Sequence, residues 1–189
     1  MSTTSKFISL KEYIMAGSPK LSHFSLNASE INLENSNDVL VKNEWISVDP
    51  YMRARMTERK NYLPSFELNK PMLGAALGKV QKSNSKNFSE GDIVVSENGW
   101  RDYFVEKDTK LQKIESNNLP IQTYLGPLGM TGHTAYIGLF KIGGLKEKQT
   151  VLVSSAAGSV GSLVCQIAKN LGCTVIASTG SDEKVEWLK

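Results

Sequence analysis

The stretch VLVSSAAGSVGSLVCQIAKNLGCTVIAS, at residues 151–178, constrains the fold of this chain more than any other part. Val151–Val153 is a continuous apolar run, typical of a strand buried on both faces in a parallel sheet. After a turn of small residues, apolar side chains return every three or four positions, which predicts an amphipathic helix that ends at Gly172. Residues 174–178 predict a second strand. This order of elements indicates the start of a doubly wound α/β domain.

The turn between strand and helix, AAGSVG at residues 156–161, is a G-x-G-x-x-G turn with alanine in the first glycine position. Gly158 leaves the backbone bare where a diphosphate would approach, and Gly161 lets the helix lie close to the strand. Free N–H groups at the helix start can bind phosphate charge. Such glycines can also serve packing alone, but the strand before the turn and the amphipathic helix after it favour dinucleotide binding.

The end of the second strand bears on the choice between NAD and NADP. A carboxylate there would bind the ribose 2′-hydroxyl of NAD and repel the 2′-phosphate of NADP. Ser178 stands at this position, and Lys184 follows one helical turn further on, after Ser181, which is expected to cap the new helix. The hydroxyls and the ammonium group can take a phosphate. Alternatively, residues 182–184 are an ordinary charged first turn of a helix, in which Asp182 binds NAD. Ser178 at the strand end and Lys184 favour NADP over this alternative.

The chain before about residue 115 has a different pattern, in which short β-branched runs alternate with polar turn clusters. These runs predict strands in a compact β-barrel or sandwich, at residues 39–42, 45–48, 77–82, 92–96 and 103–107. The pattern changes after Asn117–Pro120, so we expect two domains, residues 1–122 and 123–189.

Composition excludes several classes of function. The 189 residues carry a net charge of only +3 with scattered cations, so no nucleic-acid or membrane-binding patch is predicted. The densest basic stretch, Arg53–Lys60, is interpreted as a solvated surface. Cys165 and Cys173 have no metal-ligand spacing and are interpreted as packing residues. The first residues lack secretory features and no window is apolar enough to span a bilayer, so a cytoplasmic protein is expected.

Four segments of the chain, taken together and in order, resemble the zinc-independent medium-chain reductases, nearest to the prostaglandin and leukotriene reductases and the bacterial curcumin reductases. The segments are VDPYMRARM (48–56), NYLPSFELNKPMLGAALG (61–78), GMTGHTAYIGL (129–139) and AAGSVGSLVCQIAKNLGCTVIASTGSDEKVEWLK (156–189). The resemblance implies a GroES-like β-barrel domain followed by the first part of a Rossmann domain. It also implies NADPH-dependent reduction of carbon–carbon double bonds conjugated to a carbonyl, in a homodimer.

The resemblance further implies roles for individual residues. Lys184 matches the lysine that contacts the 2′-phosphate, and the diphosphate loop is matched by Gly158, Ser159, Val160 and Gly161. Tyr51 matches a tyrosine that lines the nicotinamide and substrate pocket, and Tyr62 matches a second one in the curcumin-type branch. Met130 and Thr134 fall on the segment that passes the nicotinamide end. As an alternative, both tyrosines could be half-buried packing residues.

The sequence departs from its relatives at two places. Asp49–Pro50 and Gly74–Ala76 stand where metal-using relatives carry zinc ligands, so we expect no metal. Thr131 and His133 stand where relatives usually have proline and an apolar residue, which leaves the local polarity open. We expect His133 to be a surface or hydrogen-bonded histidine rather than a catalytic one, because no partner is identifiable.

The implied mechanism is hydride delivery from NADPH to the β-carbon of an enone or enal. A hydroxyl donor such as Tyr51 would stabilise the enolate oxygen, and a proton would reach the α-carbon. The alternative is an NADP-binding redox-sensing or interaction protein without turnover. Because the sequence reaches only the second strand of a doubly wound domain, we also expect the 189-residue chain alone to bind cofactor poorly, to catalyse little and to self-associate through an uncovered sheet face.

Overall fold

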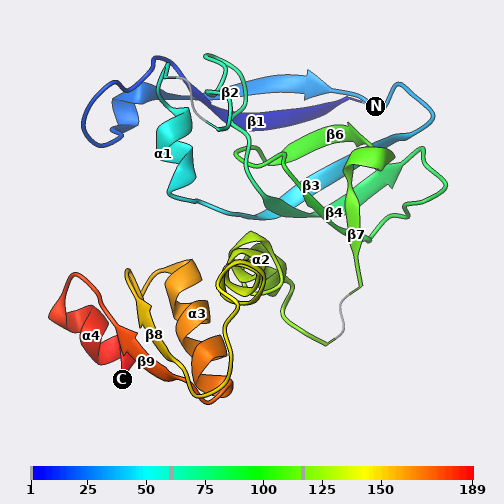
Figure 1. Cartoon of the computed structure of the whole chain (residues 1–189). Coiled ribbons are helices and arrows are strands. Elements are labelled where there is room, and N and C mark those ends of the chain that lie inside the picture. Colours follow the sequence, from blue (N-terminus) through cyan, green and yellow to red (C-terminus); the bar gives the residue numbers. More distant parts are fainter. Residues whose placement is uncertain (1, 60–61, 116–117) are drawn as a thin grey trace. The chain divides into compact units, whose positions relative to one another are not determined.

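Antiparallel strands are the main regular secondary structure of the first 121 residues in the computed structural model (Figure 1). The structure describes residues 2–59, 62–115 and 118–189, so Lys60, Asn61 and Asn117, which belong to segments named above, lie outside it. The chain divides into two compact units, Met1–Ile121 and Gln122–Lys189.

The centre of the first unit is a five-stranded antiparallel sheet with the strand order β6-β3-β4-β5-β7. Its strands are β3 (Asp38–Ile46), β4 (Ala76–Ser83), β5 (Ile93–Ser96), β6 (Tyr103–Lys107) and β7 (Gln112–Ile114). An antiparallel hairpin of β1 (Thr3–Leu10) and β2 (Phe24–Ile31) forms a second sheet. Single bridges connect β1 to Arg101 and Pro71, in the segments that precede β6 and β4. The one α-helix of the described part of this unit is α1 (Tyr51–Arg55).

The predicted strands at 39–42 and 45–48 are wrong as two strands, because β3 is continuous from Asp38 to Ile46. Its register against β4 shifts at Leu40/Val41 and again at Asn43/Trp45. Such irregularities interrupt the in–out alternation of side chains, so one strand has the sequence pattern of two. Strands β1, β2 and β7 and helix α1 were not predicted. In β1 the buried positions include Ser5 and Ser9, and buried serines hide the apolar alternation that marks a strand.

Two clusters of buried side chains stabilise the first unit. The first is formed by the five-stranded sheet and its connections and consists of Val39, Val41, Val80, Phe88, Val94, Phe104 and Leu111. The second packs around α1 and consists of Leu10, Ile14, Met52, Met56, Phe66 and Met72. Tyr51 and Trp100 pack against the second cluster from its edge. Burial of these apolar side chains is the main stabilising term for the unit, and it fixes where α1 lies.

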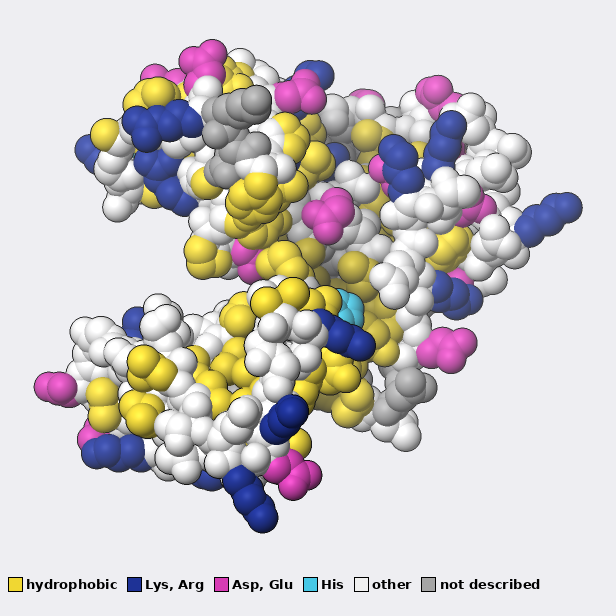
Figure 2. Space-filling view, in the orientation of Figure 1, with side chains coloured by type: hydrophobic (Ala, Val, Ile, Leu, Met, Phe, Trp, Pro, Cys, Tyr) yellow, Lys and Arg dark blue, Asp and Glu magenta, His cyan; other side chains and the backbone are white. Residues whose placement is uncertain are grey.

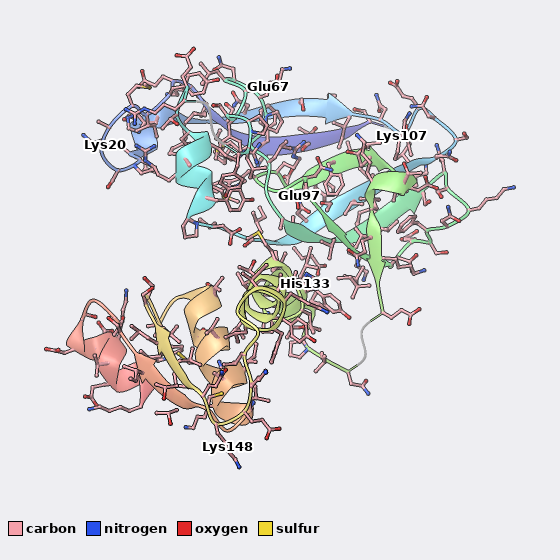
Figure 3. The ribbon with its side chains drawn as sticks, viewed as in Figure 1. Lys20, Glu67, Glu97, Lys107, His133 and Lys148 are labelled. Carbon is pink, nitrogen blue, oxygen red and sulfur yellow. The ribbon has the colours of Figure 1, made fainter. Side chains whose placement is uncertain are left out.

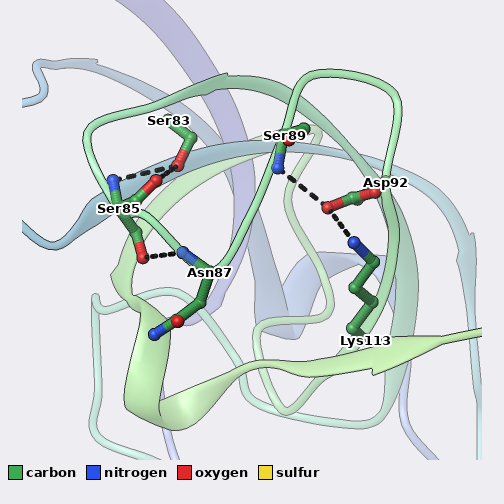
Figure 4. Close-up of polar contacts among 6 residues, drawn as sticks. All are labelled: Ser83, Ser85, Asn87, Ser89, Asp92 and Lys113. Carbon is green, nitrogen blue, oxygen red and sulfur yellow. Dashed lines mark hydrogen bonds and ion pairs between the residues drawn. The ribbon is translucent and has the colours of Figure 1, made fainter.

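Polar contacts shape the connection from β4 to β5 (Figure 4). The Ser83 hydroxyl accepts from the N–H of Ser85 at 3.0 Å, and the Ser85 hydroxyl accepts from the N–H of Asn87 at 3.0 Å. The Asp92 carboxylate accepts from the Ser89 N–H at 2.8 Å and pairs with Lys113 of β7 at 2.7 Å. These side chains supply hydrogen bonds that an irregular backbone cannot make with itself.

The second unit contains a parallel β-α-β element. The helices and strands of this unit are α2 (Met130–Tyr136), a π-helix (Ile137–Ile142), β8 (Thr150–Val153), α3 (Ser159–Asn170), β9 (Thr174–Ala177) and α4 (Asp182–Leu188). The β-α-β element consists of β8, α3 and β9. Strand β8 pairs in parallel with β9, and α3 packs against α2 and both strands. Gly172 has φ +75°, the left-handed conformation that ends a helix and favours glycine. The predicted strand, turn, helix and strand are confirmed.

The expectation that β8 is buried on both faces is wrong for this chain. Val153 is buried, but Leu152 is 73% exposed. On the neighbouring strand β9, Ile176 is 53% exposed. Side chains on one sheet face alternate with those on the other, so α3 covers one face only. Figure 2 shows hydrophobic side chains on the surface of this unit. Among the described residues, none of the helices combines the length and apolar character that crossing a bilayer requires.

Candidate functional site

A cleft of about 460 Å³ lies at the carboxyl ends of β8 and β9. The Ala156 N–H donates to the Ser178 carbonyl at 2.9 Å, and the Ser178 N–H donates to the Val153 carbonyl at 2.8 Å. These bonds tie the turn after β8 to the end of β9. Carboxyl ends of neighbouring parallel strands are where doubly wound sheets bind ligands. The cleft is lined by Ser154, Ser155, Ala157, Gly158, Ser178, Thr179, Gly180 and Lys184.

Helix α3 begins at this cleft without a side-chain cap. Gly158 is the N-cap residue, and no side chain accepts a bond from the first turn. The first N–H groups of a helix have no partner within the helix, so those of Ser159 and Val160 are available to an anion. Ser155, which lines the cleft, has φ +50°, an uncommon conformation for a residue other than glycine. The start of α3 is therefore suited to bind phosphate.

Gly161 allows α3 to approach the turn closely. A Cβ atom at this position would lie 2.4 Å from the Ser155 carbonyl oxygen and 2.9 Å from the Ala156 Cα. Both atoms belong to the backbone and cannot move aside independently. Gly161 thus serves the packing role that the sequence predicted for it, and it does not line the cleft.

Lys184 reaches the same cleft from α4. The Ser181 hydroxyl accepts from the Lys184 N–H at 3.4 Å, which confirms Ser181 as the helix cap. Ser178 and Lys184 both line the cleft, whereas Asp182 does not. The donor set is an uncapped helix start, hydroxyls and an ammonium group, without a carboxylate. This set fits a phosphorylated ligand such as NADP better than it fits NAD.

The residues of helix α2 singled out in the sequence are Met130, Thr131, His133 and Thr134, and both threonines make hydrogen bonds to nearby backbone carbonyls. Met130 is 53% exposed, and the Thr134 hydroxyl donates to the Met130 carbonyl at 2.7 Å. Thr131 is buried, and its hydroxyl donates to the Gly126 carbonyl at 2.9 Å, so its polar group is used within the turn. His133 is exposed and is labelled in Figure 3. The prediction of a surface position for His133 is therefore confirmed.

In the first unit, Tyr51 is the first residue of α1 and is half-buried. Burial raises the pKa of its phenol, and the negative charges of Glu97 and Asp49 raise it further. Loss of hydration likewise raises the pKa of Glu97, which Figure 3 labels, while the positive charge of Arg55 opposes this. The phenol therefore stays protonated and available as a hydrogen-bond donor at neutral pH.

Tyr62 belongs to the segment that follows α1 and is 77% exposed. Its phenol is one of the groups that act electrostatically on Tyr51, so the two predicted tyrosines lie in one neighbourhood of the first unit. Sequence reasoning missed Glu97 and Arg55, which complete this neighbourhood. Glu97 is distant from Tyr51 in sequence and carries no motif. Arg55 was included in a solvated surface, and this is wrong, because its side chain is buried at 9% exposure.

The positions that hold zinc ligands in metal-using relatives carry other groups here. The Asp49 carboxylate accepts from the Ser47 hydroxyl at 2.7 Å, and Gly74 lies against the Met52 side chain. Within residues 2–59, 62–115 and 118–189, no three His, Cys, Asp or Glu side chains lie close enough together to hold a metal ion. Absence of a metal from the reaction stays a prediction.

A strand-built first unit followed by a parallel β-α-β element with a cleft at its strand ends is the order of domains in medium-chain oxidoreductases. A family described as the N-terminal domain of oxidoreductase matches residues 6–114. The chain belongs to this zinc-independent medium-chain family, whose first domain is GroES-like.

Similar proteins support this assignment. The NADP(+)-dependent 2-alkenal reductase of Nicotiana tabacum is 43% identical to this chain. The match covers 98% of this chain and 55% of that protein. The NADPH-dependent curcumin reductase of Escherichia coli (strain K12) is 36% identical, covering 89% of this chain and 49% of its own. The structure of CurA with NADPH from Vibrio vulnificus matches with a TM-score of 0.89 and 35% identity, over 96% of this chain and 54% of that one. The chain thus spans about half the length of the relatives it matches.

Proposed function

We propose that this protein serves the NADPH-dependent reduction of the carbon–carbon double bond of α,β-unsaturated ketones and aldehydes, without a metal. The observation that carries the proposal is the cleft in which the uncapped start of α3, Ser178 and Lys184 meet. Its donor set suits a diphosphate and a 2′-phosphate. Relatives named as 2-alkenal and curcumin reductases indicate the reaction.

In this proposal each residue of the second unit has a binding role. Gly158, Ser159 and Val160 present backbone to the diphosphate, while Gly161 sets the position of α3. Lys184 and Ser178 bind the 2′-phosphate. Met130 and Thr134 border the nicotinamide end. NADPH, when bound, supplies the hydride for the reaction.

The first unit supplies the groups that act on the substrate. Tyr51 donates a hydrogen bond to the carbonyl oxygen, and that bond strengthens as negative charge develops on the oxygen. A raised pKa suits this role, because a phenolate could not donate. Tyr62 is the second phenol at the substrate. The proton for the α-carbon comes from solvent or from one of these side chains.

Cofactor binding is tested separately from turnover. Adenosine 2′,5′-bisphosphate carries the 2′-phosphate and the adenosine-side phosphate of the diphosphate, whereas AMP lacks the 2′-phosphate. We expect the amide resonances of Ser159 and Val160 to shift with both ligands, and those of Ser178 and Lys184 to shift with the bisphosphate and much less with AMP. Equal shifts of Ser178 and Lys184 with both ligands would contradict a 2′-phosphate site.

Turnover is tested by NADPH oxidation with but-3-en-2-one, in the presence of a chelator. Enone-dependent oxidation supports the reductase and a metal-free reaction. Binding of NADPH without enone-dependent oxidation would favour an NADP-binding protein without turnover.

The proposal includes a homodimer that works in the cytoplasm. The free thiols of Cys165 and Cys173 suit a reducing compartment. Sedimentation equilibrium and cell fractionation test these two points.

A further inference from the structure

Arg55 is unusual among the charged residues of the first unit. In the described residues three charged side chains are buried, namely Asp38, Arg55 and Asp108. Both carboxylates accept several hydrogen bonds, which explains their burial. Among the described side chains no carboxylate lies within ion-pair distance of Arg55, and the negative charge of Glu97 acts on it only from further away. Because an unpaired buried charge is costly and an apolar side chain would fill the same space, the guanidinium needs another explanation.

The contacts of Arg55 converge on one short segment. Its Nε donates to the Pro64 carbonyl at 3.0 Å, and its guanidinium carbon lies 4.2 Å from the centre of the Phe66 ring. Its own carbonyl accepts from the Phe66 N–H at 2.8 Å. Backbone and side chain of one residue therefore hold the same three-residue stretch. A planar guanidinium can donate at its edge while it stacks on an aromatic face, and lysine cannot do both.

The bond between Arg55 and this stretch links the parts of the chain that carry Tyr51 and Tyr62. Arg55 is the last residue of α1, and Tyr51 is the first. Tyr62 lies two residues before Pro64, so fixing Pro64 restricts where Tyr62 can lie. Two further bonds hold the stretch, from the Ser65 hydroxyl to the Thr57 carbonyl at 2.5 Å and from the Tyr13 hydroxyl to the Phe66 carbonyl at 3.1 Å.

We propose that Arg55 is a positioning residue that holds the Pro64–Phe66 stretch on α1 and thereby keeps Tyr62 beside Tyr51 at the substrate. This inference rests on the proposed function, since it assigns both phenols to one substrate. Arg55 itself touches no reacting atom. Its effect passes through Tyr62, which distinguishes it from a residue that merely stabilises the fold.

The kinetic test uses the active protein with the variants Arg55→Met, Arg55→Lys, Tyr62→Phe and the double variant Arg55→Met with Tyr62→Phe. A matched control is Arg53→Met, because Arg53 lies on the same helix but donates to the Gly17 carbonyl, at 2.8 and 3.2 Å. We expect Arg55→Met to lower kcat/KM for an enone about tenfold or more, with NADPH affinity unchanged. Arg55→Lys should lose less, and Arg53→Met should stay within about twofold.

Non-additivity identifies the role. If Arg55 acts through Tyr62, Arg55→Met should cost less than about twofold further in the Tyr62→Phe background. A loss in the double variant equal to the product of the single losses would overturn the proposal, and so would full activity of folded Arg55→Met.

A second measurement does not depend on enone reduction. Amide hydrogen exchange over residues 62–66 should be about tenfold faster in Arg55→Met and unchanged in Arg53→Met. Unchanged exchange in Arg55→Met, or equal acceleration in both variants, would overturn the proposal. If Arg55→Met does not fold, Arg55→Lys is measured in its place and should show a smaller acceleration of the same amides. Failure of the wild-type protein to reduce any enone would refute the proposed function while leaving this measurement decisive for Arg55.

Discussion

Lys184 is the only charged residue among the described residues that line the cleft at the carboxyl ends of β8 and β9. A 2′-phosphate would be bound by this ammonium group, whereas the 2′-hydroxyl of NAD has no charge for it to bind. We expect Lys184→Ala to weaken NADPH binding by about 1.5–3 kcal/mol, the value of one charge-assisted contact, and to leave NADH binding nearly unchanged. Calorimetry of both cofactors checks this, with exposed Lys169→Ala as the control. Equal losses for NADPH and NADH would rule out a 2′-phosphate contact.

Tyr51 provides a prediction about ionisation. Because burial, Glu97 and Asp49 raise the pKa of its phenol, the folded state favours the protonated form. The resulting stabilisation is present below the unfolded pKa, about 10, and is lost as the pH rises through the higher folded pKa. Spectrophotometric titration should show a late phenolate step that is absent in Tyr51→Phe. Glu97→Gln should move this step to lower pH, and an unmoved step would show that Glu97 does not act on Tyr51.

At the scale of residues, the sequence predicts what a local motif encodes. Ser178 and Lys184 stand at fixed sequence distances from the glycine turn after β8, so it could be expected that both would line one cleft with that turn. Arg55 and Glu97 belong to no motif, and their environment depends on residues far along the chain. The basic stretch Arg53–Lys60 gave no indication in the sequence that the guanidinium of Arg55 is buried against Phe66.

At the scale of elements, the position of α3 depends on the missing side chain of Gly161. In Gly161→Ala the new Cβ would lie 2.4 Å from the Ser155 carbonyl oxygen, so the helix or the turn must shift. We expect a loss of about 1–3 kcal/mol in the free energy of unfolding, as for other overpacked sites, together with weaker NADPH binding. Urea unfolding followed by the fluorescence of Trp187, the tryptophan of the second unit, measures the loss.

Gly138→Ala is the matched control for this substitution. Gly138 also lies in a helix, but a Cβ there meets no atom within 4 Å. Alanine should therefore be neutral or stabilising by up to about 1 kcal/mol. If both substitutions destabilise equally, close packing of α3 is not the reason for glycine at position 161.

Elements with a strong apolar period were predictable and the others were not. The order β8, α3, β9 and α4 follows from apolar periodicity and from Gly172, and the structure confirms it. In contrast, β3 was divided in two because its register shifts break the alternation. Strands β1 and β2 pair with each other through residues 20 or so positions apart, and their polar composition gives no local signal.

At the scale of the whole molecule, two buried carboxylates make the strand-built unit sensitive to acid. A hydrogen bond from the Ser85 hydroxyl is the main cause that lowers the pKa of Asp108, and Asn87 adds to it. The backbone N–H of Asn35 is the main cause for Asp38, whose carboxylate ties the turn before β3. Such lowered pKa values stabilise the fold above the unfolded pKa of about 3.9, and the stabilisation is lost as the pH falls through the folded values.

Asp108→Asn tests this dependence, because the amide keeps the shape of the side chain and removes its charge. In a Trp187→Phe background, fluorescence reports only on Trp45 and Trp100 of the first unit. We expect Asp108→Asn to lower the urea midpoint at pH 7, where the wild-type carboxylate is ionised and accepts from Ser85 and Asn87. The difference from wild type should shrink as the pH falls below about 4, since both proteins then carry an uncharged group there. As a control, substitution of the exposed Glu58 by Gln should leave the urea midpoint unchanged at both pH 7 and low pH. If Asp108→Asn lowers the urea midpoint by the same amount from pH 7 to pH 3, the shape of the Asp108 side chain and not its charge stabilises the fold.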